Sequence, residues 1–182
     1  MEHTPRPVGG SELACVAGQI GRRPHALSRI AARCPWGYPA VVEDLPYDDR
    51  GRPFPTLFYA TCPTLVAAVG ALESAGGVRR LAALLDDPLI AAGLRAAVAY
   101  ERRRRATLAR RYGLPMLDAG VALRTGIGGV ADHRAVKCLH AHAAHALARP
   151  GYTLGRRVLG DAGELWCADR RCAAFCAERP RA

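Results

Sequence analysis

Residues 38–62 read YPAVVEDLPYDDRGRPFPTLFYATC. Two segments rich in β-branched and aromatic residues, 38–43 and 56–62, flank a stretch at 48–52 that contains two aspartates and a glycine. Residues of the kind in the two flanking segments favour strands, and those in the stretch between them favour a turn. The pattern therefore predicts an antiparallel β-hairpin.

A Cys-Pro step lies at one end of each predicted strand. Cys34 comes just before the first strand, and Cys62 ends the second. Because antiparallel pairing returns the chain to its starting edge, we expect both thiols at the same end of the hairpin. A proline after cysteine restricts the backbone beside the sulfur and removes an amide donor, as at the end of ferredoxin cluster motifs.

Most of the remaining chain has helical patterns. Glycine pairs and prolines mark the ends of several of these segments, as helix stop signals do. The predicted helices span 11–19, 25–32, 65–73, 78–85, 88–112, 132–148 and 154–165. We therefore expect a mostly helical α+β domain with a small antiparallel β-hairpin.

The chain of 182 residues has the length of one domain, and 50% hydrophobic with 23% charged residues is typical of soluble proteins. We expect a loosely ordered leader with a short helix at 1–21, a single α+β domain at 22–165 and a cysteine-rich tail at 166–182. No apolar segment has the length or continuity of a membrane span or secretory signal. We expect a cytoplasmic protein whose seven cysteines are thiols, metal ligands or catalytic groups rather than a disulfide framework.

Four of the six histidines lie between positions 133 and 145, together with Cys138. On a continuous helix over 132–148, Cys138, His142 and His145 would share one stripe, with His140 nearer the apolar face. Thiolate and imidazole are the ligands that zinc and other soft metals prefer. This segment is the first candidate for a functional site.

A shared site would need the hairpin thiols as well. Cys34, Cys62 and Cys138, completed by His140, His142 or His145, suit a tetrahedral zinc ion or an iron–sulfur cluster. The two cofactors remain alternatives at this stage. The tail adds Cys167, Cys172 and Cys176 as a further ligand set, a lid or simply a cysteine-rich end.

A metal-free thiol enzyme is an alternative for the same segment. Lys137 and a neighbouring histidine could lower the pKa of Cys138. Glu43, Tyr59 or Asp132 could orient a histidine base or contact a substrate. The sequence does not indicate which reaction would follow.

The formal net charge of +10 permits another class of function. Arginines dominate it, since only one of the 26 basic residues is a lysine, a skew that codon usage in a GC-rich genome also produces. The run Arg102, Arg103, Arg104 and Arg105 spans every side of its predicted helix, so we expect it to be mostly solvated. A basic adaptor that binds nucleic acid or an acidic protein through this run is the alternative function.

Four motifs resemble one bacterial family. They are CPWGYP at 34–39, PFPTLFYATCP at 53–63, GIGGV at 126–130 and VKCLHAH at 136–142. The chain from about residue 22 to residue 176 is similar to the domain of unknown function catalogued as family 501, a family that looks common in actinobacteria. The resemblance implies a cytosolic bacterial protein and supplies no catalytic residues.

Overall fold

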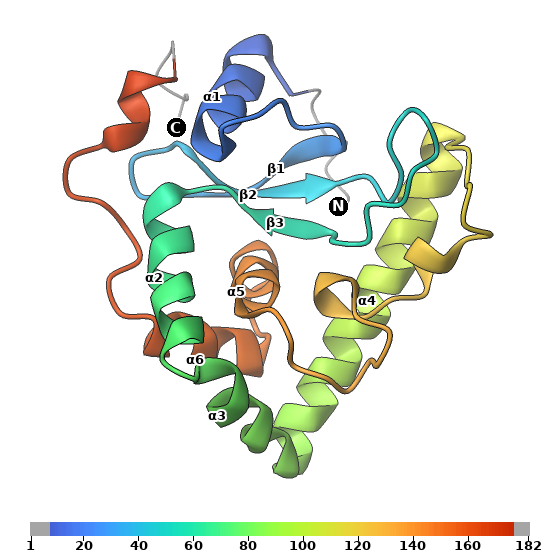
Figure 1. Ribbon diagram of the computed structural model, residues 1–182, viewed down its shortest axis with the longest axis vertical. Coiled ribbons are helices and arrows are strands. Elements are labelled where there is room, and N and C mark those ends of the chain that lie inside the picture. Colours follow the sequence, from blue (N-terminus) through green and yellow to red (C-terminus); the bar gives the residue numbers. More distant parts are fainter. Residues whose placement is uncertain (1–7, 177–182) are drawn as a thin grey trace.

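A three-stranded antiparallel sheet lies between helix α1 and the other helices in the computed structural model, which describes residues 8–176 (Figure 1). Its strands are β1 (Leu27–Arg33), β2 (Pro39–Asp44) and β3 (Phe58–Ala60), in the order β1-β2-β3. Every residue of the central strand β2 is buried. Together with the helices, this sheet confirms the predicted mostly helical α+β domain.

The predicted hairpin is formed by β2 and β3. Val41 faces Ala60, and Glu43 faces Phe58. The connection is tied by the Asp48 side chain, which accepts hydrogen bonds from the backbone amides of Arg50 and Arg52 at 2.9 Å each. Aspartate commonly stabilises turns in this way.

The prediction of a helix over residues 25–32 is wrong. Residues 27–33 form β1, which pairs antiparallel with β2. The register shifts at three places, between Leu27 and Arg29, Ile30 and Ala32, and Ala32 and Arg33. Such irregularities interrupt the alternation of side chains between the two faces of a strand, so the sequence carries no clear strand period here.

Six α-helices in the described residues complete the domain: α1 (Gly10–Ile20), α2 (Pro63–Ser74), α3 (Gly77–Ala83), α4 (Pro88–Tyr112), α5 (Leu139–Ala148) and α6 (Thr153–Asp161). The longest, α4, has local signals at both ends. The Asp87 side chain accepts a hydrogen bond from the Leu89 amide at 2.8 Å, and Pro88 occupies the first turn. Gly113 ends the helix in the left-handed conformation, as glycine often does.

Helix α5 starts later than the sequence predicts. Residues 132–138 are not helical, and Cys138 is the extended residue just before the helix. A tertiary contact marks this start, because the carboxylate of Glu73 on α2 accepts a hydrogen bond from the Leu139 amide at 2.6 Å. Cys138 therefore does not share a helical stripe with His142 and His145.

The central helix α5 lies beneath the sheet, with α2 and α4 on either side and α6 beside it (Figure 1). Gly155 permits the close approach of α5 and α6, since a Cβ atom at this position would lie 2.5 Å from the His142 carbonyl oxygen. On the other side of the sheet, a disulfide joins Cys15 of α1 to Cys176. This pair departs from the expectation that all the cysteines would be thiols, metal ligands or catalytic groups, whereas the other five cysteines are free.

Candidate functional site

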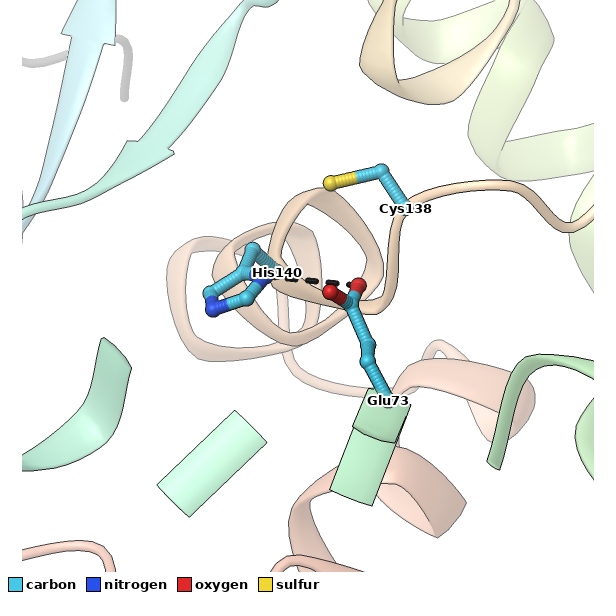
Figure 2. A group of neighbouring side chains, drawn as sticks. All are labelled: Glu73, Cys138 and His140. Atoms are coloured by element: carbon cyan, nitrogen blue, oxygen red, sulfur yellow. Dashed lines mark ion pairs between the residues drawn. The ribbon is translucent and has the colours of Figure 1, made fainter. Parts of the chain in front are cut away.

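Three potential metal ligands, one from α2 and two from the start of α5 and the residue before it, gather at one place (Figure 2). Glu73 comes from α2, Cys138 immediately precedes α5, and His140 lies in its first turn. Their ligand atoms all lie within 4.8 Å of one another, and no other group of three such residues within 8–176 meets this spacing. The three residues, called the α5-start group below, offer one sulfur, one nitrogen and one oxygen.

Helix α2 orients the imidazole of His140. The Nε2 atom lies 3.0 Å from the carbonyl oxygen of Val66. A carbonyl oxygen only accepts hydrogen bonds, so Nε2 carries the hydrogen and donates it. The other nitrogen, Nδ1, lies 3.3 Å from Glu73 Oε1. Nδ1 is therefore the ring atom that faces the carboxylate.

The contact between Cys138 and His140 shifts the pKa of each group toward its charged form. The hydrogen bond with Cys138 raises the pKa of His140 to about 9, with further support from the Val66 carbonyl and Glu73. Burial would raise the pKa of the Cys138 thiol, but the hydrogen bond with His140 and the Ala141 amide outweigh it and lower the pKa. Lowered thiol pKa values are common at helix N-termini beside a cationic group.

A pocket of about 540 Å³ opens beside this group. Glu73, Cys138, Lys137 and Asp132 line it together with the glycine loop at 128–129. Gly128 has a φ of +71°, and a Cβ atom there would lie 3.2 Å from the Ala141 side chain. Glycine thus allows the loop to close tightly against the start of α5.

The inner histidines of α5 belong to a different environment. His142 is fully buried, and its Nδ1 lies 2.6 Å from the hydroxyl of Tyr152. His145 is also buried, and its Nδ1 lies 2.8 Å from Glu101 Oε1. Burial, and to a smaller extent electrostatic repulsion from His145, lowers the pKa of His142 to about 4. Neither histidine lies in the compact α5-start group.

Cys34 and Cys62 lie near the same end of the hairpin, as antiparallel pairing predicts. The Cys34 amide donates to the Tyr38 carbonyl at 2.9 Å, and the Cys62 amide approaches the Ala40 carbonyl at 3.4 Å. The described residues contain no group in which Cys34, Cys62 and Cys138 all lie within 4.8 Å. The hairpin thiols instead neighbour Cys167 and Cys172 electrostatically.

Of the four residues predicted to support Cys138 or a histidine, two lie at the pocket and two lie elsewhere. Lys137 and Asp132 line the pocket. Glu43 is fully buried and binds Arg29 and Arg104, with the closest nitrogen–oxygen distances at 2.6 and 2.8 Å. Tyr59 lies on β3 and is exposed. Glu43 is therefore a structural anchor between the sheet and α4.

The arginine run is less solvated than expected. Arg104 is committed to Glu43. Arg105 is completely buried, where it donates to the backbone carbonyls of Pro55 and Thr125 and lies 3.7 Å from Glu101. Arg103 is exposed and Arg102 is half-buried. The prediction of a mostly solvated run is wrong because half of it joins α4 to the rest of the domain.

Sequence reasoning missed Glu73. This residue lies near the end of α2, 65 positions before Cys138, and only the packing of α2 against α5 brings the two together. Its location just before the Gly76-Gly77 helix stop was visible. Nothing local linked it to a distant cysteine and histidine.

The fold and the site define a mostly helical α+β protein with a cysteine, histidine and glutamate group beside a pocket. Residues 30–160 match the model of the family described as "Protein of unknown function (DUF501)", so the chain belongs to this family. Glu73, Cys138 and His140 all lie within the matched region. No curated protein and no solved structure shows significant similarity to the chain.

No helix among the described residues combines the length and apolar character needed to cross a bilayer.

Proposed function

We propose that Glu73, Cys138 and His140 bind one zinc ion beside the pocket. The observation that carries the proposal is the convergence of their sulfur, nitrogen and oxygen atoms within 4.8 Å. Zinc accepts all three ligand types, and catalytic zinc sites typically have three protein ligands and one open position.

The contacts around the group are those that a zinc site needs. A ligating histidine normally donates its second ring N–H to a carbonyl or carboxylate, and His140 Nε2 contacts the Val66 carbonyl in this way. The Leu139 amide holds one oxygen of Glu73. A bound cation would replace the hydrogen on His140 Nδ1 and offset the negative charges of Cys138 and Glu73.

The open position would make the ion chemically useful. Cys138 and Glu73 both line the pocket, so a molecule there could reach the fourth coordination position. Zinc could then polarise a carbonyl or phosphoryl oxygen or activate a water molecule. Lys137 provides a positive charge on the same wall, which would favour an anionic substrate.

The test is the zinc content of the purified full-length chain, measured by mass spectrometry after removal of loosely bound metal. We expect about one zinc per chain, and Cys138→Ser should remove it. The matched control is Cys172→Ser, which removes another poorly exposed thiol and should retain this zinc.

The rate of Cys138 alkylation distinguishes a zinc-bound thiolate from a metal-free thiol. If zinc binds Cys138, chelation should accelerate the reaction of this thiol with iodoacetamide. Absence of zinc binding, with equally rapid alkylation of Cys138 with and without chelator, would contradict the proposal and support a metal-free thiol nucleophile.

A further inference from the structure

The loop that follows α4 presents apolar side chains to solvent. Met116, Leu117 and Val121 are exposed, as is Tyr112 at the end of α4. Four of the eight exposed large hydrophobic side chains of residues 8–176 therefore lie within ten consecutive positions, 112–121. Single exposed apolar residues are ordinary on a protein surface, whereas a cluster of them commonly marks an interaction site.

This loop is anchored at its base. The Asp118 side chain accepts hydrogen bonds from the Tyr47 hydroxyl at 2.9 Å and from the Ala122 amide at 2.8 Å. The Leu117 amide donates to the Gly51 carbonyl at 3.2 Å, and the loop therefore lies beside the hairpin connection (Figure 1). Because the backbone is already held in place, a partner that binds the apolar side chains would lose little free energy to loop ordering.

Two glycines locate the apolar side chains relative to their neighbours. A Cβ atom at Gly120 would lie 3.9 Å from Met116 Sδ and 3.6 Å from a guanidinium nitrogen of Arg124. Met116 and Arg124 therefore lie beside the same backbone position. A Cβ atom at Gly51 would lie 3.0 Å from Leu117 Cγ, which places this leucine against the hairpin connection. The apolar side chains thus border segments that carry arginines.

The arginines around these side chains are exposed. Arg50 lies in the hairpin connection, Arg124 follows the loop, and Arg110 and Arg111 occupy the last turn of α4. The Arg111 guanidinium lies 5.7 Å from the centre of the Tyr112 ring. Within residues 8–176, none of these four arginines forms an ion pair with a carboxylate. Their charges are therefore available to a partner.

We propose that these four apolar and four basic side chains, called the post-α4 patch below, bind an acidic amphipathic segment of another protein. The partner's apolar side chains would cover the loop, and its carboxylates would pair with the arginines. Of the exposed residues in 48–52 and 110–124, only Asp49 is acidic, so the charge of the patch complements an acidic segment. Protein interfaces typically combine an apolar centre with a polar rim, and methionine, tyrosine and arginine are enriched in them.

The composition of the post-α4 patch favours a protein over a nucleic acid or a membrane. Sites for single-stranded nucleic acid stack bases on aromatic side chains, and Tyr112 is the one aromatic residue of the patch. Surfaces that enter a membrane are commonly amphipathic helices with tryptophan, phenylalanine or leucine on the apolar face, whereas Met116, Leu117 and Val121 lie in an anchored loop. The planar guanidinium group of arginine can bind a carboxylate through two parallel hydrogen bonds.

The test starts from the purified full-length chain and a phage-displayed library of random peptides. Selected peptides should combine aspartate or glutamate with large apolar residues. One of them, synthesised with a fluorescent label, should bind with an affinity that falls as the salt concentration rises. Leu117→Ser and Arg111→Glu should each weaken this binding at least about tenfold, the effect of losing one interface anchor.

Leu89→Ser is the matched control. Leu89 is 80% exposed and Leu117 is 71% exposed, but Leu89 lies in the first turn of α4, and the 25 residues of this helix span about 38 Å. This variant should keep the wild-type affinity for the peptide. Both leucine variants should unfold at the wild-type urea concentration and keep the wild-type zinc content, so failure of one proposal leaves the other standing.

Several results would overturn the proposed partner. They are a selection that enriches no peptide, selected peptides without acidic residues, or equal peptide affinity for Leu117→Ser and the wild-type chain. Preferential binding of single-stranded DNA or of phosphatidylserine vesicles, lost in Leu117→Ser and Arg111→Glu, would overturn it as well, because the patch would then belong to a nucleic acid or a membrane surface.

Discussion

The start of α5 and its inner turns place the same residue type in opposite settings. His140 has 26% of its side chain exposed and contacts Glu73 and Cys138. His142, two positions later, is fully buried against Tyr152. The pKa of the first is raised to about 9, and that of the second is lowered to about 4. Burial and partners, rather than position in a histidine-rich segment, decide which histidine can bind a ligand.

The largest expected effect tests the inner network. Glu101→Ala would leave His145 and Arg105 buried without their carboxylate partner. Removing one partner of a buried ionic pair typically costs about 3–5 kcal/mol. Urea unfolding should show a loss of that size while zinc content is unchanged. A loss below about 1 kcal/mol would contradict a structural role for Glu101.

A substitution at the start of α5 should instead weaken zinc binding with little loss of stability. Glu73→Gln keeps the shape of the side chain and an acceptor for the Leu139 amide, but removes the charged ligand. Zinc affinity should fall at least about 100-fold, beyond the range typical of outer contacts, and stability should change by less than about 1 kcal/mol. Competition with a chromogenic chelator measures the affinity. Unchanged affinity would exclude Glu73 as a ligand.

A smaller effect is expected at the Tyr152 hydroxyl. Tyr152→Phe removes the partner of His142 Nδ1, and His142 Nε2 already lacks a hydrogen-bond partner in the structure. Leaving a buried polar group unsatisfied costs about 1–3 kcal/mol. Thermal and urea unfolding should both show this loss, with no change in zinc content. Full stability in this variant would mean that the hydroxyl contributes nothing to the inner network.

The mildest test compares the titration of the two histidines. His142 stays neutral in the folded state down to about pH 4, whereas the unfolded chain binds a proton at about pH 6.5. Its contribution to stability is therefore lost as the pH falls from about 6.5 to 4. For His140 in metal-free protein, the contribution is complete below about pH 6.5 and is lost as the pH rises through about 9.

Ring NMR signals, followed against pH, separate these two titrations. Measurements of global stability would also contain the titration of Asp44, because burial raises the pKa of this carboxyl group to about 7. Its contribution to stability changes with pH in the direction opposite to that of His142. Two midpoints near 6.5 would remove the contrast between the ends of α5.

Local signals predicted much of the fold. The hairpin followed from composition and a turn, and α4 from apolar spacing and the residues at its ends. Strand β1 was missed because its shifts in register disturb the two-residue alternation. The start of α5 was missed because Glu73, from a different helix, binds the first amide of this helix.

The site was predictable only in part for the same reason. The segment 133–145 correctly drew attention to Cys138 and His140, which share a local motif. Glu73 reaches them only through the packing of α2 on α5. The hairpin pairing predicted that Cys34 and Cys62 would lie at the same end of the hairpin. The path of the C-terminal segment, which the sequence does not predict, brings the Cys167 carbonyl to Trp36 and the Cys172 sulfur to Gln19.

X-ray absorption at the zinc edge of the full-length protein tests the start of α5 most directly. The zinc should have one sulfur ligand at about 2.3 Å, with the remaining ligands nitrogen or oxygen at about 2.0–2.2 Å. A shell of four sulfurs, or a protein that binds no zinc, would contradict the assignment of Glu73, Cys138 and His140 as a metal site.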